Sequence, residues 1–377
     1  MAKEDKKAQG FAPPKSKDTK SIISAINNYS KANLASLAGE DERVSSDNPF
    51  KYSTGILSLD KYLGVGGVLG GRIMNAWGWE GSGKTLTALS VIASFQAQGK
   101  KCAFLDAEGT LSNSMATAVG VNVDDLIVVQ STPERILTGE DYFSLIQMLI
   151  QSEVELIVID STPALIPSQR MAATIGQGQK ASHASMMSEG LQQVTALLNA
   201  HRRSVIWFIN QVRAKPMQMF GPSEDHTGGN ALKFYATYSL DVDKMDDIVK
   251  KVPQPNGRYE EANIGVTVRA KLKKNKTAII PIGSIEFDIY FKSCTDVNGV
   301  TYQAGVDIYK DMVECGIANG VINQSSSWFS YGDIKANGKD ALIMALRKAD
   351  RSIIEEIRSK VLHGDGKPLP VPEAPAE

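Results

Sequence analysis

The sequence is poor in the residues that build covalent or metal-bound frameworks. Its 377 residues include only three cysteines, Cys102, Cys294 and Cys315, and four histidines. Because the cysteines are odd in number and unclustered, they indicate neither a disulfide framework nor a zinc site. This usage is typical of a protein that folds around an ordinary hydrophobic core in a reducing compartment.

Long hydrophobic runs and an excess of one charge are also missing. No segment approaches the roughly 18 consecutive apolar residues of a membrane span. The first twenty residues are polar and rich in lysine, unlike a secretory signal, so we expect a cytoplasmic protein without a membrane partner. Lysine and arginine total 41 against 42 aspartate and glutamate, a formal net charge of −1. Any contact with nucleic acid must therefore come from a local patch or loop.

What the sequence does contain is an alternation of apolar runs and amphipathic segments. Helices are predicted at residues 85–97, 140–151 and 182–201. Strands are predicted at residues 72–77, 101–106, 126–130, 155–160, 204–210, 238–242, 264–272 and 285–291. Repeated strand–helix units predict an α/β fold with a mostly parallel, twisted sheet and helices on both faces. In such sheets, ligands bind beyond the carboxyl ends of the strands.

Changes in composition divide the chain into five predicted parts. Residues 1–20 lack large apolar side chains and predict a flexible arm, and residues 364–377 are proline-rich and predict a loose tail. Residues 21–48 are predicted as a helix and linker because Ile22, Ile23 and Ile26 recur at helical spacing. The remainder is predicted as a core at 49–294 and a small α+β domain at 295–363.

A glycine-rich loop between a predicted strand and a predicted helix indicates a nucleotide site. Its residues match the pattern G-x-x-x-x-G-K-[ST] and are Gly78, Trp79, Glu80, Gly81, Ser82, Gly83, Lys84 and Thr85. Such a loop curls backbone N–H groups around phosphate oxygens, and the following helix points its positive end at them. We expect the lysine to reach the β- and γ-phosphates of ATP and the threonine hydroxyl to bind Mg²⁺.

Two acidic strand ends accompany this loop. Asp160 ends an apolar run about 75 residues after the loop, which is typical of the carboxylate that supports Mg²⁺ in P-loop enzymes. Asp106 and Glu108 follow the strand predicted next to the loop. A carboxylate there can orient or deprotonate the attacking water. On pattern alone, a solvent-exposed acid or a helix cap explains these two residues equally well.

The order of five motifs is similar to that of the RecA family of bacterial and phage recombinases. The motifs are Gly78 to Thr85, Ala103 to Glu108, Leu156 to Ser161, Phe208 to Arg213 and Thr227 to Ala236. The similarity extends over roughly residues 21–362, and the last two motifs separate this family from helicases and other P-loop ATPases. It implies a RecA-type core in a DNA-dependent ATPase recombinase.

The resemblance also implies residue roles. Glu108 would activate water, and Gln211 would sense the γ-phosphate. Lys274 and Lys276 would complete the ATP site of a neighbouring protomer, whereas a solvated strand end is the plainer interpretation of that segment. The helix at 21–38 would dock on the next protomer, giving a homo-oligomeric helical filament. Met115 occupies the position where many relatives have a tyrosine against adenine.

The resemblance further implies two DNA-binding segments. They would contact single-stranded DNA and a homologous duplex, and loading factors or a single-strand-binding protein would be further partners. The first segment, about residues 169–179, contains Arg170, Met171, Ile175 and Gly176, and the second, residues 211–229, contains Arg213, Lys215, Met219, Phe220, Gly228 and Gly229. Basic residues can meet phosphates, and apolar ones can lie against bases. The length of the second segment without predicted structure also indicates function.

Two other functions share the nucleotide site. A RecA-type ATPase could act on protein or as a ring helicase, and a filament regulator could bind DNA without turnover. The motif at Thr227 to Ala236 and the lysines at 274 and 276 argue against the first. Intact Lys84, Glu108 and Asp160 argue against the second. We therefore expect ATP hydrolysis to drive filament turnover during pairing and strand exchange.

Overall fold

A computed structural model describes residues 18–40, 49–173, 182–214, 224–226, 231–254, 257–279 and 283–364. Residues 1–17 and 365–377, which make up most of the predicted arm and tail, lie outside the described residues. The chain forms two compact units, Met1–Pro49 and Phe50–Glu377. Within the described ranges, no helix combines the length and the apolar content needed to cross a bilayer.

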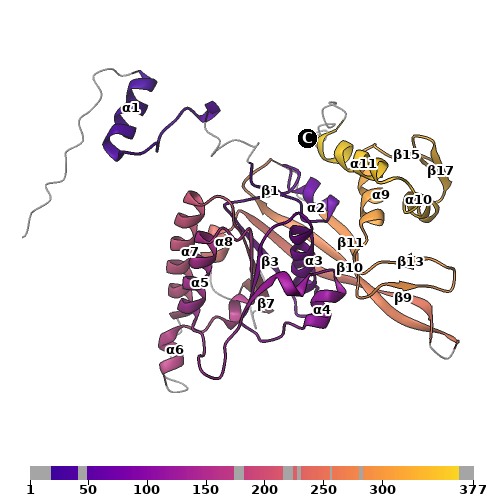
Figure 1. The fold of residues 1–377 in the computed structure, drawn as a ribbon, viewed down its shortest axis with the longest axis horizontal. Coiled ribbons are helices and arrows are strands. Elements are labelled where there is room, and N and C mark those ends of the chain that lie inside the picture. The colour runs from indigo at the N-terminus through magenta and orange to yellow at the C-terminus, as the bar shows by residue number, and fades with distance from the viewer. Residues whose placement is uncertain are drawn as a thin grey trace, which may run out of the picture. The chain divides into compact units, whose positions relative to one another are not determined.

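The larger unit is built on a ten-stranded sheet (Figure 1). Its main strand order is β14-β11-β10-β9-β3-β7-β6-β4-β5, and β8 pairs with β7. The strands from β9 to β5 in that order are parallel, and β10, β11 and β14 are antiparallel to their neighbours. The parallel strands are β3 (Arg72–Gly78), β4 (Cys102–Asp106), β5 (Leu126–Val129), β6 (Leu156–Asp160), β7 (Val205–Ala214) and β9 (Tyr238–Pro253). The predicted α/β class is confirmed.

Helices cover both faces of this sheet (Figure 1). Successive side chains of the buried strands point to opposite faces of the sheet, and each face carries its own hydrophobic cluster. Sequence neighbours such as Trp207 and Phe208 therefore belong to different clusters. On one face the cluster includes side chains of α3 (Lys84–Ala97), and on the other those of α5 (Gly139–Gln151) and α7 (Ser182–Ala200). Because the sheet is covered on both sides, its central strands are apolar almost throughout.

The predicted strands at 238–242 and 264–272 were too short. β9 has 16 residues and pairs with the 17 residues of β10 (Tyr259–Asn275) as far as Pro253 opposite Tyr259. In the outer half of this hairpin, charged residues such as Asp246, Asp247, Lys250 and Lys251 interrupt the apolar ones, so no continuous hydrophobic run marks the strands. Val252 is buried there beside Ile264 and Tyr302, which stabilises the extension.

The C-terminal residues form a third hydrophobic cluster. Helices α9 (Ile308–Ala318), α10 (Lys339–Leu346) and α11 (Arg351–His363) pack around Met312, Leu342 and Ile357. A three-stranded sheet, which the sequence pattern did not predict in detail, joins them: β15 (Asn323–Ser325), β16 (Trp328–Tyr331) and β17 (Ile334–Asn337). The division between core and C-terminal domain at residue 295 stays a prediction.

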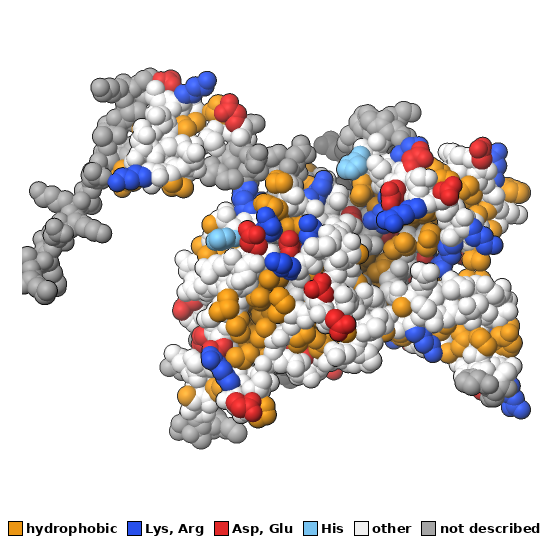
Figure 2. Space-filling view, viewed as in Figure 1, with side chains coloured by type: hydrophobic (Ala, Val, Ile, Leu, Met, Phe, Trp, Pro, Cys, Tyr) orange, Lys and Arg blue, Asp and Glu red, His pale blue; other side chains and the backbone are white. Residues whose placement is uncertain are grey.

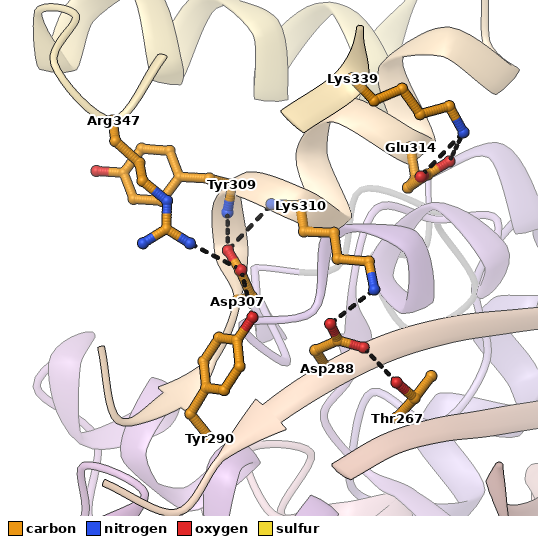
Figure 3. A network of polar contacts seen from close by, with 9 residues as sticks. All are labelled: Thr267, Asp288, Tyr290, Asp307, Tyr309, Lys310, Glu314, Lys339 and Arg347. Carbon is orange, nitrogen blue, oxygen red and sulfur yellow. Dashed lines mark hydrogen bonds and ion pairs between the residues drawn. The ribbon is translucent and has the colours of Figure 1, made fainter. Parts of the chain in front are cut away.

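Two carboxylates tie these helices to the main sheet (Figure 3). Asp288 accepts hydrogen bonds from Lys310 at 2.6 Å and from Thr267 at 2.7 Å. Asp307 accepts from Arg347 at 2.8 Å and from Tyr290 at 3.0 Å. Both carboxylates are buried, so these charge-assisted bonds offset the cost of removing them from water.

The smaller unit consists of α1 (Thr19–Ser30) and the turn after it. Asp18 caps the helix by accepting from the Ser21 backbone N–H at 3.0 Å. Ile22, Ile26 and Tyr29 are each more than a third exposed. Because α1 ends at Ser30, the helix predicted at 21–38 has about the right start but is too long.

The remaining elements are short. They are η1 (Ala38–Glu40), β1 (Lys51–Tyr52), α2 (Leu57–Tyr62), β2 (Val68–Leu69), α4 (Asn113–Ala118), η2 (Val123–Asp125), η3 (Thr162–Ala164), α6 (Ser168–Ala172), β8 (Glu224–His226), α8 (Ala231–Tyr235), β11 (Ser284–Tyr290), β12 (Cys294–Thr295), β13 (Thr301–Tyr302) and β14 (Gly305–Val306).

Candidate nucleotide-binding and catalytic site

The glycine-rich loop lies where parallel sheets bind ligands, between the end of β3 and the start of α3. Gly78 ends the strand against β9, where a Cβ would lie 2.1 Å from the carbonyl oxygen of Val242. Gly83 precedes the helix with φ 89°, a left-handed conformation that other residues rarely adopt. The backbone path therefore requires glycine at both positions. With this path, the loop can wrap around an anion.

Lys84 lies inside this loop. Its Nζ donates to the carbonyl oxygens of Gly78 at 3.1 Å and Trp79 at 2.6 Å, and to Ser82 Oγ at 3.3 Å. The side chain is 7% exposed, and burial lowers its pKa while the carboxylates around it oppose that shift. A buried ammonium surrounded by glycine-rich backbone suits the phosphate contact that the sequence predicts.

The predicted Mg²⁺ ligands lie side by side. Thr85 Oγ1 donates to Asp160 Oδ2 at 2.6 Å. The pKa of Asp160 is raised to about 6, chiefly by burial and also by the nearby carboxylates of Glu108 and Asp106, while the Thr85 hydrogen bond and the Lys84 charge oppose the rise. A hydroxyl and a carboxylate are the hard oxygen donors that Mg²⁺ prefers, so these residues fit the metal and its charge would relieve the crowding of carboxylates.

Glu108 is held by two groups from other strands, Ser161 directly after β6 and Gln211 within β7. Its Oε1 accepts from Ser161 Oγ and from Gln211 Nε2, the latter at 3.1 Å. The Asp160 carbonyl accepts from the Ala107 and Glu108 N–H groups at 2.8 Å and 3.2 Å, which fixes the turn. The structure thus brings the predicted base and the predicted γ-phosphate sensor into contact beside Asp160. Ser161, which the sequence suggested only as a cap or bonding partner, is part of this group.

Asp106 has a different environment from Glu108. It is 2% exposed and accepts from the backbone N–H groups of Gly109 at 2.8 Å, Thr110 at 3.2 Å and Leu111 at 2.9 Å, and from Gln130 Nε2 at 2.6 Å. These donors occupy both carboxylate oxygens. Asp106 therefore shapes the loop that presents Glu108.

A pocket of about 520 Å³ adjoins the glycine-rich loop. Besides the loop and the start of α3, it is lined by Ser114, Met115, Ala118, Val119 and Phe291. Met115 was predicted beside the base of the nucleotide. Ala118 and Val119 were missed, although they follow Met115 at helical spacing. Phe291 comes from a distant part of the sequence, next to the end of β11, and no local signal indicates it.

Lys274 and Lys276 lie away from this loop along the sheet. Lys274 and Lys276 lie at the end of β10, where Asn275 pairs with Tyr238 at the start of β9. β9 runs parallel to β3, and the glycine-rich loop follows the end of β3. The lysines and the loop therefore lie at opposite edges of the sheet. Both Nζ atoms donate to the Phe234 carbonyl oxygen at the end of α8, at 3.1 Å and 3.0 Å. Burial, together with the neighbouring Lys276 charge, lowers the pKa of Lys274 to about 8.

The predicted DNA-binding segments are described only in part. Arg170 and Met171 lie exposed on α6, whereas Ile175 and Gly176 lie outside the described residues. In the second segment β7 continues through Arg213 to Ala214 and pairs with β8. The expectation of a stretch without secondary structure was therefore wrong for residues 211–214 and 224–226. The other members lie outside the described residues, and they are Lys215, Met219, Phe220, Gly228 and Gly229.

Comparison with known proteins decides the family. The family model described as RecA N-terminal domain matches residues 17–296. The chain belongs to the RecA family. A protein RecA of Thermus thermophilus is 40% identical over 316 residues, which cover 83% of this chain and 85% of that relative. Those of Cereibacter sphaeroides and Clostridium acetobutylicum are each 37% identical, covering 83% and 86% of this chain and 84% of each relative.

Proposed function

We propose that this RecA-family protein is a DNA-dependent ATPase that forms a filament on single-stranded DNA and catalyses pairing and strand exchange with a homologous duplex. The observation that carries the proposal is the contact of Gln211 Nε2 with Glu108 Oε1 at 3.1 Å. It joins the predicted hydrolytic carboxylate to β7, the strand that leads into the second predicted DNA segment. Nucleotide state and DNA binding can therefore act on each other through one side chain.

Within one protomer, this chain's residues bind and orient the nucleotide. Gly78 to Thr85 hold the phosphates, Thr85 and Asp160 hold Mg²⁺, and Met115 and Phe291 border the base. Bound Mg²⁺ supplies charge neutralisation at the phosphates. Glu108 orients the attacking water and accepts its proton, and Ser161 and Gln211 keep its carboxylate in place.

The remaining positive charge at the γ-phosphate comes from a second protomer. Lys274 and Lys276 lie toward the start of the parallel strands, whereas their own glycine-rich loop lies at the strand ends. Their position favours contact with the nucleotide of a neighbouring copy. The Phe234 ring, which lies beneath the Lys276 ammonium, is 73% exposed and suits the same interface. The ATP site is then complete only in the filament.

The small N-terminal unit supplies the second half of the protomer contact. None of the side chains of α1 is buried, and Ile22 and Ile26 lie on one face of the helix at 40% and 37% exposure. Docking this face on the next protomer removes it from water. A head-to-tail contact of this kind, repeated without closing, generates a helical filament.

Mixing two inactive variants tests the shared site. Lys84→Ala lacks the phosphate-binding lysine but keeps the lysines donated to a neighbour, and a Lys274→Ala, Lys276→Ala double variant has the reverse defect. Each should lack DNA-stimulated turnover alone. At equal amounts, about one interface in four combines two intact halves, so turnover should recover to about a quarter of the normal rate. A mixture as inactive as its components would contradict a site shared between protomers.

A further inference from the structure

The turn that follows β4 is wound around the carboxylate of Asp106, the last residue of that strand. Oδ1 of Asp106 accepts from the backbone N–H groups of Gly109 at 2.8 Å and Thr110 at 3.2 Å, and Oδ2 accepts from that of Leu111 at 2.9 Å. Glu108 lies inside this turn, directly before the first of these donors. The orientation of one carboxylate therefore sets the path of the backbone that carries Glu108.

A further donor to this carboxylate comes from outside the turn. β4 and β5 are parallel neighbours in which Leu105 lies opposite Val129. Asp106 and Gln130 are the next residues of the two strand paths, so both lie at the carboxyl edge of the sheet. There the Gln130 Nε2 donates to Asp106 Oδ2 at 2.6 Å. The proposed function leaves this glutamine without a role.

The contribution of Gln130 lies in this hydrogen bond rather than in packing. Gln130 is exposed, whereas Asp106 is buried, so replacing the glutamine removes little from the core. The backbone of Asp106 is held independently, by strand pairing and by the buried Tyr142, whose hydroxyl donates to the Asp106 carbonyl oxygen at 3.3 Å. Because hydrogen bonds to charged groups are the stronger ones, loss of Gln130 acts mainly on the orientation of the carboxylate.

That orientation reaches Glu108 through the backbone on each side of it. The Glu108 N–H donates to the Asp160 carbonyl oxygen at 3.2 Å, and the next N–H, of Gly109, donates to Asp106 Oδ1. If the carboxylate turns, the second of these bonds weakens and Glu108 is anchored on one side only. A displacement of about 1 Å at a reacting group is enough to cost up to a hundredfold in rate.

We propose that Gln130 is a positioning residue for ATP hydrolysis, which fixes the Asp106 carboxylate and, through the turn wound around it, the orientation of Glu108. This inference rests on the proposed function and adds to it a residue on the edge strand of the sheet. The glycine-rich loop takes no part in the contact, so phosphate binding does not depend on it. Asp106→Asn leaves the contact possible, because the new amide can donate to Gln130 Oε1 while its oxygen still accepts from Gly109.

Steady-state ATP hydrolysis by the full chain with saturating single-stranded DNA tests this role. Gln130→Met keeps the length of the side chain without a donor, and Gln130→Lys keeps an N–H donor. Gln147→Met is the matched control, because Gln147 donates to Gln193 at 2.9 Å on the helices α5 and α7. The kcat should fall about tenfold in Gln130→Met and stay within about twofold of the natural chain in the other two. The KM for ATP and the binding of a fluorescent ATP analogue should change less than about twofold in all three.

Hydrogen exchange of the ATP-free chain follows the turn without any turnover. The amides of residues 109–111 should exchange about tenfold faster in Gln130→Met than in the natural chain, and Gln147→Met should leave them unchanged. If Gln130→Met does not fold, Gln130→Glu takes its place in both experiments, because an ionised carboxylate there cannot donate to Asp106.

Two results would overturn the proposal. One is a kcat of Gln130→Met equal to that of Gln147→Met. The other is an equal loss of kcat and of ATP-analogue binding, which would mark a general structural role. If the natural chain itself hydrolyses no ATP, the proposed function fails instead, and unchanged exchange in Gln130→Met would then also refute the hold of Gln130 on the turn.

Discussion

At the scale of single residues, hydrogen-bond donors distinguish the acids beside the glycine-rich loop. Asp106 is satisfied by donors of its own loop, and Asp160 is paired with Thr85. Glu108 is exposed and receives its donors from two other strands, Ser161 after β6 and Gln211 in β7. Of the three, we therefore propose Glu108 as the acid that meets the attacking water.

Replacing Glu108 by glutamine should separate binding from turnover. The amide keeps the size of the side chain but accepts no proton, so ATP binding should persist while turnover falls by about a hundredfold or more. ATP-analogue binding and steady-state turnover measure the two effects. Asp106→Asn is the control, because it should lower thermal stability more than it lowers the rate of ATP turnover. Unchanged turnover in Glu108→Gln would show that another group activates water.

Asp60 gives a stability prediction independent of the site. It is fully buried, and burial raises its pKa to about 6, although it accepts from Thr54 N at 2.8 Å and Thr54 Oγ1 at 2.7 Å. Because the folded pKa exceeds the unfolded value, the protonated form contributes stability that is complete below about pH 4 and is lost as pH rises through 6. Asp60→Asn lacks this loss. In urea unfolding, its stability relative to the natural chain should therefore improve by about 2–3 kcal/mol between pH 4 and pH 8. A constant difference across that range would contradict this account.

The residues that sequence could predict are those whose chemistry is local. Lys84 and Thr85 belong to one short pattern, and Asp160 ends an apolar strand. Phe291 joins the same pocket from more than two hundred residues away, and Ser161 contacts Glu108 only because two strands lie side by side. Contacts of that kind depend on tertiary packing, which no local pattern encodes.

At the scale of elements, the hydrophobic pattern of the sequence predicts the buried strands and misses the half-exposed parts of β9 and β10. The strands between helices coincide with their predicted ranges to within a few residues. β9 and β10 extend far beyond their predicted ranges because backbone pairing continues where Asp246 and Lys251 interrupt the apolar pattern. Charged side chains are intermixed over the surface in view, as the balanced composition implies (Figure 2).

The carboxylate network between the sheet and the C-terminal helices should be worth more than a surface ion pair. Arg347 and Asp307 are 15% and 4% exposed, so Arg347→Met leaves a buried carboxylate short of its partner and should cost about 3 kcal/mol of unfolding free energy. Arg351→Met removes an exposed pair with Glu355, at 91% and 63%, and should cost less than about 1 kcal/mol. Chemical unfolding compares them, and equal costs would refute this view of the network.

At the scale of the whole molecule, we propose that assembly depends on the separate N-terminal unit. Ile22→Glu with Ile26→Glu places charge on the exposed apolar face of α1 and should abolish filaments, because the carboxylates would have to lose water at the contact. Ser24→Glu, on another face of the same helix, is the control. Electron microscopy and light scattering report filament length. Normal filaments from the double variant would remove α1 from the proposed interface.

We propose above all that DNA activates an ATP site completed between protomers. The most direct test of this proposal is the rate of ATP hydrolysis with and without single-stranded DNA, measured at low and high salt. We expect strong stimulation that fades as salt weakens the phosphate contacts. Turnover that is indifferent to DNA would contradict the account and favour an ATPase directed at protein, whereas DNA binding without any turnover would favour a filament regulator.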